Sequence, residues 1–208
     1  MIVCLSYIIS VSMQNSLSTT YIDLLRPKSL SPSLYSICTV VLGSLIIAAC
    51  AQITIPLPFT PVPITGQSFA IILIGILFGS KRGAATALLY LTEGAIGLPF
   101  FAGASSGIGL FFGPTGGYLF GFLFAAYVAG LLAEYQWDRS VAKAALAMFL
   151  SSLVILLHGT LWLSFFTGMG KAFQLGFLPF IPGDIIKTTI GATLLPFCWK
   201  YFGKHSSQ

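Results

Sequence analysis

The chain has 208 residues, of which 56% are hydrophobic and only 7% are charged, and its mean hydropathy is +0.94. A soluble domain carries about 25% charged residues, which keep its surface free of large apolar patches. The composition therefore excludes a soluble globular domain. It also argues against a nucleic-acid-binding protein, in spite of the net charge of +5. It is typical of a membrane protein with several spans, and the length allows about six helices of about 20 residues each.

Six apolar segments are predicted to form membrane-spanning helices in an all-α bundle. Their expected bounds are 34–53, 65–79, 83–98, 117–133, 142–166 and 183–200. The second and third segments are short for a bilayer whose hydrocarbon core is about 30 Å thick. Outside this membrane-embedded domain, 34–202, we expect two flanking segments. Residues 1–33 are predicted to form a cytoplasmic extension that is loosely ordered or lies on the surface, and residues 203–208 a C-terminal tail.

The positive charges indicate how the bundle is oriented. With six spans and a cytoplasmic N-terminus, eight of the ten Lys and Arg residues fall on the inside, Lys171 falls on the outside, and Lys187 lies within the sixth span. This bias follows the positive-inside rule. It predicts a multi-pass protein of the cell (inner, cytoplasmic) membrane with both termini in the cytoplasm.

The three connections on the predicted outer side are long and rich in glycine and proline. They comprise residues 53–66, 99–117 and 167–183. Within a membrane, irregular apolar backbone is tolerated only where protein buries it or where it lines a cavity. These segments therefore predict loops that fold over a pocket in the outer half of the bundle.

Asp184 and Lys187 are the first candidates for ligand contacts. They lie three residues apart in the opening turns of the sixth span, on one helix face. Ionisable groups in a span are costly and usually face an interior cavity. Lys187, beside the positive end of the helix dipole, is suited to a carboxylate, and Asp184 to N–H donors. The alternative is a self-contained ion pair that anchors the helix end.

Three further polar residues lie within the predicted spans. Glu93 either lines the same pocket, pairs with Lys187, or caps structure at the interface. Gln67 is either a pocket wall residue or a partner for loop backbone. His158, a lone membrane histidine, is more often an interhelical hydrogen-bonding group than a ligand-binding residue.

Small residues recur at every fourth position of the fourth span, and this row comprises Gly117, Gly121, Ala125, Ala129 and Ala133. Such a row lets two helices approach closely. It predicts either packing inside the bundle or contact with a partner membrane subunit.

The sequence carries no signature of catalysis. It has no GxxxxGK[ST] phosphate-binding loop, so we do not expect this chain to hydrolyse ATP. No Ser/His/Asp or Cys/His set and no metal-ligand spacing stands out, and the four scattered cysteines are interpreted as small packing residues. We therefore expect neither an enzyme nor a cofactor or metal.

Four segments together resemble the BioY family. They read ITIPLPFTPVPITGQ (53–67), YLTEGAIGLPFFAG (90–103), GPTGGYLFGF (113–122) and PFIPGDIIKTTIGA (179–192). This family comprises the biotin-specific substrate-binding (S) components of energy-coupling-factor (ECF) vitamin transporters. The resemblance covers about residues 34–202. The sequence departs from many relatives at residues 103–107, where they have a more glycine-rich stretch.

The resemblance implies a six-helix S-component fold that binds biotin from outside. It also implies that Asp184 and Lys187 contact the ligand, with Tyr118 and Gln67 as further pocket residues. Transport would be driven by an ECF module of one transmembrane coupling subunit and two ATP-binding subunits, or the protein would work as a solitary facilitator. Two other hypotheses are an S component for another vitamin or a biotin precursor, and a structural membrane subunit.

Overall fold

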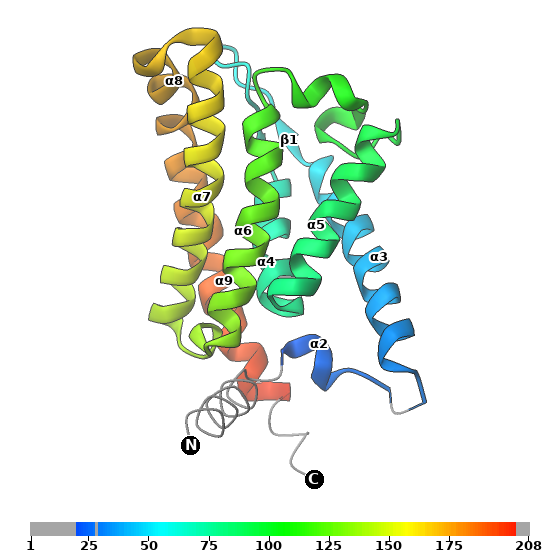
Figure 1. Ribbon diagram of the computed structural model, residues 1–208. Coiled ribbons are helices and arrows are strands. Elements are labelled where there is room, and N and C mark those ends of the chain that lie inside the picture. Colours follow the sequence, from blue (N-terminus) through cyan, green and yellow to red (C-terminus); the bar gives the residue numbers. More distant parts are fainter. Residues whose placement is uncertain (1–19, 28, 203–208) are drawn as a thin grey trace, which may run out of the picture.

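The computed structural model describes residues 20–27 and 29–202, and six long helices of this region form one bundle (Figure 1). These helices are α3 (Pro32–Ala51), α4 (Gln67–Phe78), α5 (Ser80–Ala95), α6 (Gly116–Glu134), α7 (Val141–Thr167) and α9 (Ile181–Phe202). They confirm the six expected helices, with ends that differ by at most three residues. Residues 1–19 and 203–208, which include most of the predicted extension and the tail, lie outside the described residues.

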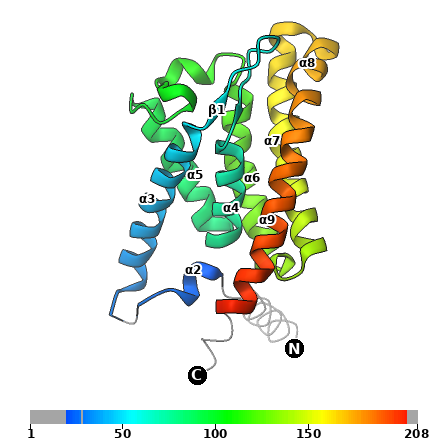
Figure 2. The same ribbon diagram turned by 180° about the vertical axis from the view of Figure 1, so that it is seen from behind.

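Shorter elements lie at the two ends of the bundle. They are α2 (Tyr21–Leu24), strands β1 (Thr54–Ile55) and β2 (Ile64–Thr65), the 3₁₀ turns η1 (Ala102–Ala104), η2 (Ile108–Phe111), η3 (Trp137–Arg139) and η4 (Leu178–Phe180), and α8 (Met169–Gly176). Strands β1 and β2 pair antiparallel, with Thr54 opposite Thr65. The strands, η1, η2, α8 and η4 belong to the three long loops, at what we call the loop end. Helix α2 and η3 lie at the opposite α2 end, where α9 also finishes (Figures 1 and 2).

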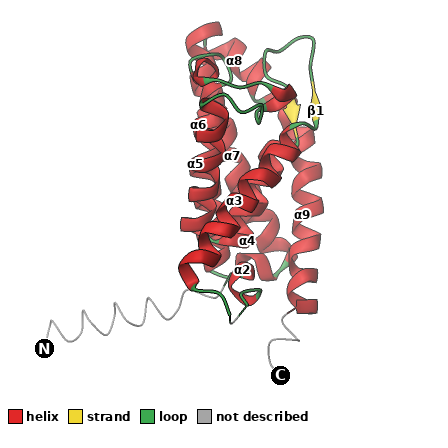
Figure 3. Ribbon diagram, turned by 90° about the vertical axis from the view of Figure 1, so that its right-hand side faces the viewer, coloured by secondary structure: helices red, strands yellow, loops and turns green. Residues whose placement is uncertain are grey.

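Helix lengths differ in a way that matters for the site. Helices α3, α6 and α7 are long and apolar enough to cross a membrane. Helix α4 has 12 residues, so it is about 18 Å long, well short of the roughly 30 Å hydrocarbon core. The β1–β2 segment extends from the first residue of α4 to the loop end (Figure 3).

Local sequence accounts for where the helices begin and end. The hydroxyl of Ser31 caps α3 by accepting a hydrogen bond from the backbone N–H of Leu34, and Pro32 occupies the first turn, where a missing N–H costs nothing. Gly79, with φ +86°, separates α4 from α5 in a conformation that a side chain would strain.

The row of small residues on α6 packs inside the bundle. Gly117, Gly121, Ala125, Ala129 and Ala133 are all buried. A Cβ on Gly117 would lie 2.1 Å from the Cβ of Trp162 on α7. This placement favours the first of the two readings of the row, close helix packing within one chain.

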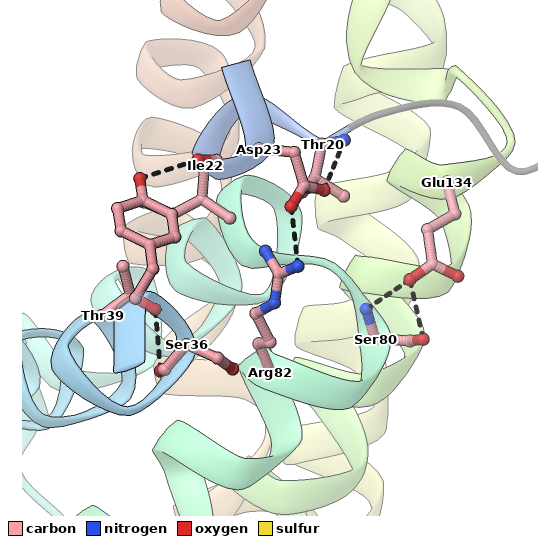
Figure 4. Close-up of polar contacts among 9 residues, drawn as sticks. Thr20, Ile22, Asp23, Ser36, Thr39, Ser80, Arg82 and Glu134 are labelled. Atoms are coloured by element: carbon pink, nitrogen blue, oxygen red, sulfur yellow. Dashed lines mark hydrogen bonds and ion pairs between the residues drawn. The ribbon is translucent and has the colours of Figure 1, made fainter. Parts of the chain in front are cut away.

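The described part of the N-terminal extension packs against the α2 end. Tyr21 is buried, its hydroxyl donates to the backbone oxygen of Leu195 on α9, and its ring lies 4.3 Å from that of Trp199. Asp23 pairs with Arg82 of α5 at 2.6 Å (Figure 4). Burial opposes the charged form of Asp23, but hydrogen bonds from Thr20 and Arg82 hold the pKa of this carboxyl below its usual value. Residues 20–24 therefore pack against the folded bundle, while most of the predicted extension lies outside the described residues.

Close backbone packing between α6 and the α4–α5 turn predicts a strong effect of one methyl group. A Cβ on Gly130 would lie 2.3 Å from the backbone of Gly79 and Ser80, whereas a Cβ on Gly170 would meet no other atom within 4 Å. We expect Gly130→Ala to destabilise the protein by about 1–3 kcal/mol or more, through overpacking. Thermal unfolding in detergent measures this effect, with Gly170→Ala as the matched control. Equal melting temperatures for the two variants would contradict the packing described.

Candidate functional site

A cavity of about 210 Å³ opens at the loop end, between the β1–β2 segment and helices α4, α6, α7 and α9. Much of its wall is apolar and comes from residues far apart in the sequence, among them Val62, Phe101, Leu110, Phe122, Ile155, Leu156 and Phe180. Its polar groups include Thr65, Gln67, Ser68, Tyr118, Ser152, Asp184 and Lys187. An apolar wall with a few converging polar groups is the usual form of a small-molecule site. The cavity confirms the prediction that the loops enclose a pocket at this end of the bundle.

Asp184 and Lys187 form the charged part of the cavity wall. Their closest atoms, Oδ1 of Asp184 and Nζ of Lys187, are 3.9 Å apart, and their side chains are 15% and 22% exposed. Each is held by other groups. The hydroxyl of Ser152 on α7 donates to Oδ2 of Asp184. Nζ of Lys187 donates to the backbone oxygen of Thr65 and to Oγ of Ser68, each at 2.9 Å.

This arrangement leaves both ions with unused bonding capacity. A lysine ammonium has three donors and a carboxylate has about four acceptor sites. Thr65 and Ser68 take two of the donors, and the described residues supply one short hydrogen bond to Asp184. The direct contact between the ions is long, and each ion is also bonded to groups on other elements. The site can offer acceptors to N–H groups and a donor to an oxygen of the same ligand.

Gln67 and Tyr118 both lie in the cavity wall, which for Gln67 is one of the two positions considered from the sequence. Nε2 of Gln67, on the first turn of α4, donates to the hydroxyl of Tyr90 at 2.5 Å. The hydroxyl of Tyr118 donates to the backbone oxygen of Gly176 at the end of α8, at 2.6 Å. Tyr118 therefore presents its ring to the cavity while its hydroxyl fastens a neighbouring loop.

Glu93 and His158 are not part of this wall. Oε2 of Glu93 is buried without a hydrogen-bond partner among the described residues, and the described ion pair of Lys187 is with Asp184. His158 is exposed on α7, where its Nδ1 lies 2.8 Å from the backbone oxygen of Val154 and its ring stacks on Phe124. Of the six candidate residues, the cavity brings together Asp184, Lys187, Gln67 and Tyr118.

Two serines that hold the charged pair, Ser68 and Ser152, were not among the residues predicted from the sequence. Ser68 follows Gln67 directly. Ser152 belongs to a Ser-Ser pair within the otherwise apolar run 144–157, and this interruption is a signal that could have identified it. Among residues 20–27 and 29–202, no group of three His, Cys, Asp or Glu side chains could hold a metal ion.

Comparisons with known proteins agree with one another. Residues 18–204 match the BioY family. The chain is 44% identical, over 137 residues, to the probable biotin transporter BioY of Pyrococcus horikoshii. The alignment covers 66% of this chain and 79% of that protein. It is 36% identical, over 165 residues, to the biotin transporter BioY of Rhizobium etli, and this alignment covers 75% of this chain and 88% of that protein.

A solved structure has the same fold. The crystal structure at 2.1 Å of the S-component for biotin from an ECF-type ABC transporter superposes with a TM-score of 0.73 at 26% sequence identity. The match covers 83% of this chain and 95% of that one. The arrangement of helices is therefore that of an ECF S component, as predicted.

The ion pair and hydrogen bonds of Asp184 and Lys187 predict how each residue contributes to the stability of the fold. We expect Lys187→Met to lower the free energy of unfolding by about 1–3 kcal/mol, because the Asp184 carboxylate and the Ser68 hydroxyl lose a partner. The double variant Asp184→Asn/Lys187→Met should recover part of that loss. Chemical unfolding in detergent measures both, and Lys171→Met, at an exposed lysine on α8, serves as the control. A parent-like stability of Lys187→Met would contradict the contacts described.

Proposed function

The chain belongs to the BioY family, and we propose that it captures biotin in the cavity at the loop end and mediates its passage across the membrane. The observation that carries this proposal is the charged pair in an apolar-walled cavity, with bonding capacity left on both ions. The names of the relatives, which are biotin transporters, and of the solved biotin S-component support it.

Biotin has the chemistry that this cavity requires. Its ureido ring has two N–H donors and a carbonyl oxygen, its sulfur ring and chain are apolar, and its chain ends in a carboxylate. We assign Asp184 as the acceptor of ureido N–H groups and Lys187 as a donor to an oxygen of the ligand. Gln67 and Tyr118 complete the wall around them. The apolar side chains then cover the rings and the chain of the ligand.

The proposed orientation places the loop end outside the cell and the α2 end in the cytoplasm. The positive-inside distribution of Lys and Arg supports this orientation, and it places both termini and the basic turn of Lys81 and Arg82 inside. We place the protein in the cytoplasmic membrane. Uptake then requires the cavity to open toward the cytoplasm, a step that an ECF module of one transmembrane coupling subunit and two ATP-binding subunits would drive.

Binding by the purified protein tests the ligand and the site together. We expect the detergent-solubilised chain to bind biotin, and both Asp184→Asn and Lys187→Ala to weaken binding by about tenfold to a hundredfold, the usual effect of removing a hydrogen bond to a charged group. Glu93→Gln, a matched change outside the cavity wall, should bind like the parent. Equilibrium binding of labelled biotin provides the measurement, and unfolding curves establish that each variant is folded.

Other outcomes separate the remaining hypotheses. Displacement of labelled biotin by thiamine, riboflavin or dethiobiotin at equal or lower concentration would favour another vitamin or a precursor as the ligand. If Asp184→Asn and Lys187→Ala changed only stability, and no vitamin bound to the folded parent, the pair would be structural and the proposal would fail.

Transport is tested in biotin-starved cells. We expect cells carrying this chain to take up more biotin than empty cells, and an added ECF module to increase uptake further, because the chain has no phosphate-binding loop of its own. Accumulation of labelled biotin with and without the module is the measurement. Uptake equal to that of empty cells in both backgrounds would overturn the transport claim.

A further inference from the structure

Residues 97–115 lie between α5 and α6 at the loop end of the bundle (Figure 1), and we call them the cover segment. Five of its residues belong to the cavity wall, namely Phe101, Ala102, Ser105, Leu110 and Thr115. The segment consists of two 3₁₀ turns and irregular backbone. Its position over the cavity therefore depends on bonds to its neighbours.

Gln52, at the end of α3, holds this segment from the outside with both ends of its side-chain amide. The two N–H groups of Nε2 are shared among three backbone oxygens, those of Ala48 on its own helix at 3.0 Å, Phe101 at 3.3 Å and Phe100 at 3.4 Å. Oε1 accepts a hydrogen bond of 2.9 Å from the backbone N–H of Ala104. Ala104 has φ +57°, a left-handed conformation that costs energy in a non-glycine residue, so this bond helps to hold it there.

Tyr90 on α5 holds the same point from inside the bundle. Its side chain is fully buried, and its hydroxyl donates to the backbone oxygen of Phe100 at 3.1 Å. That hydroxyl also accepts the bond from Gln67, which lines the cavity. The ring of Tyr90 meets that of Phe101 edge to face, with centroids 5.6 Å apart. Gln52 of α3 and Tyr90 of α5 thus both bind the backbone oxygen of Phe100, and Tyr90 is in turn bound by Gln67 of α4. Phe100 is next to Phe101, a residue of the cavity wall.

We propose that Gln52 and Tyr90 are positioning residues that fix the cover segment over the cavity, and thereby set how long the ligand stays bound. Neither residue belongs to the cavity wall. Their effect is therefore expected in the rate of ligand release, which on this proposal is limited by movement of the cover segment. The inference rests on the proposed function, since it takes biotin as the ligand whose release is measured.

Release kinetics provide the first readout. We expect Gln52→Ala and Tyr90→Phe each to speed biotin dissociation from the full-length chain by about threefold to tenfold, the usual effect of losing one or two net hydrogen bonds, with a smaller change in the association rate. Labelled biotin is chased with an excess of unlabelled biotin. Gln174→Ala, at an exposed glutamine on α8, and Tyr127→Phe, at a half-exposed tyrosine on α6, are matched controls that should release biotin like the parent.

Hydrogen exchange of the ligand-free protein provides a second readout that does not depend on biotin. Backbone amides of the cover segment should exchange faster in Gln52→Ala and Tyr90→Phe than in the parent and the two controls. Gln52 is exposed, so its variant tests the idea even if the deletion of the buried Tyr90 hydroxyl impairs folding.

The two readouts separate the possible failures. Parent-like release by a folded Gln52→Ala would overturn this inference and leave the proposed function standing, whether or not exchange had changed. A folded parent that does not bind biotin would overturn the proposed function. If, in addition, hydrogen exchange of the cover segment were the same in Gln52→Ala and Tyr90→Phe as in the parent, the claim that these residues fix the segment would fail as well.

Discussion

The short length of α4 is the constraint on which the site depends. A helix of 12 residues is too short to cross the hydrocarbon core, and the β1–β2 segment continues from the start of α4 toward the loop end (Figure 3). Within a membrane, backbone that is not helical is tolerated only where protein covers it or where it lines a cavity. The change from strand to helix therefore lies in the cavity wall. There the backbone oxygen of Thr65 and the hydroxyl of Ser68 become partners for Lys187.

Those partners explain how a membrane protein can keep two charged side chains in the wall of a cavity. An isolated ion in a low-dielectric interior is costly, and a tight ion pair would have little left to offer. Here Ser152 satisfies part of Asp184, and Thr65 and Ser68 satisfy part of Lys187, while the ions stay 3.9 Å apart. Because these contacts hold both side chains in place, the proposed binding of biotin would require little reorganisation. Close packing of α6 on α4 and α7 provides the rigid frame that holds them.

Helix positions and the charged pair could be predicted from the sequence, because apolar length and buried charge are local signals. Rotations of side chains about their helices could not. Glu93 and Gln67 are both polar residues of predicted spans, yet only Gln67 faces the cavity. The roles of Ser152, Gln52 and Tyr90 depend on contacts with residues 10 to 52 positions away. Packing of Tyr21 against α9 likewise joins two ends of the chain that no sequence pattern pairs.

The most direct test of the central claim is an experimental structure of this chain with biotin bound. The account predicts biotin in the cavity at the loop end, with a ureido N–H donating to the Asp184 carboxylate and a ligand oxygen accepting from Nζ of Lys187. The cover segment should lie over the ligand. Biotin bound elsewhere, or bound in this cavity with Asp184 and Lys187 contacting only Ser152, Thr65 and Ser68, would contradict it.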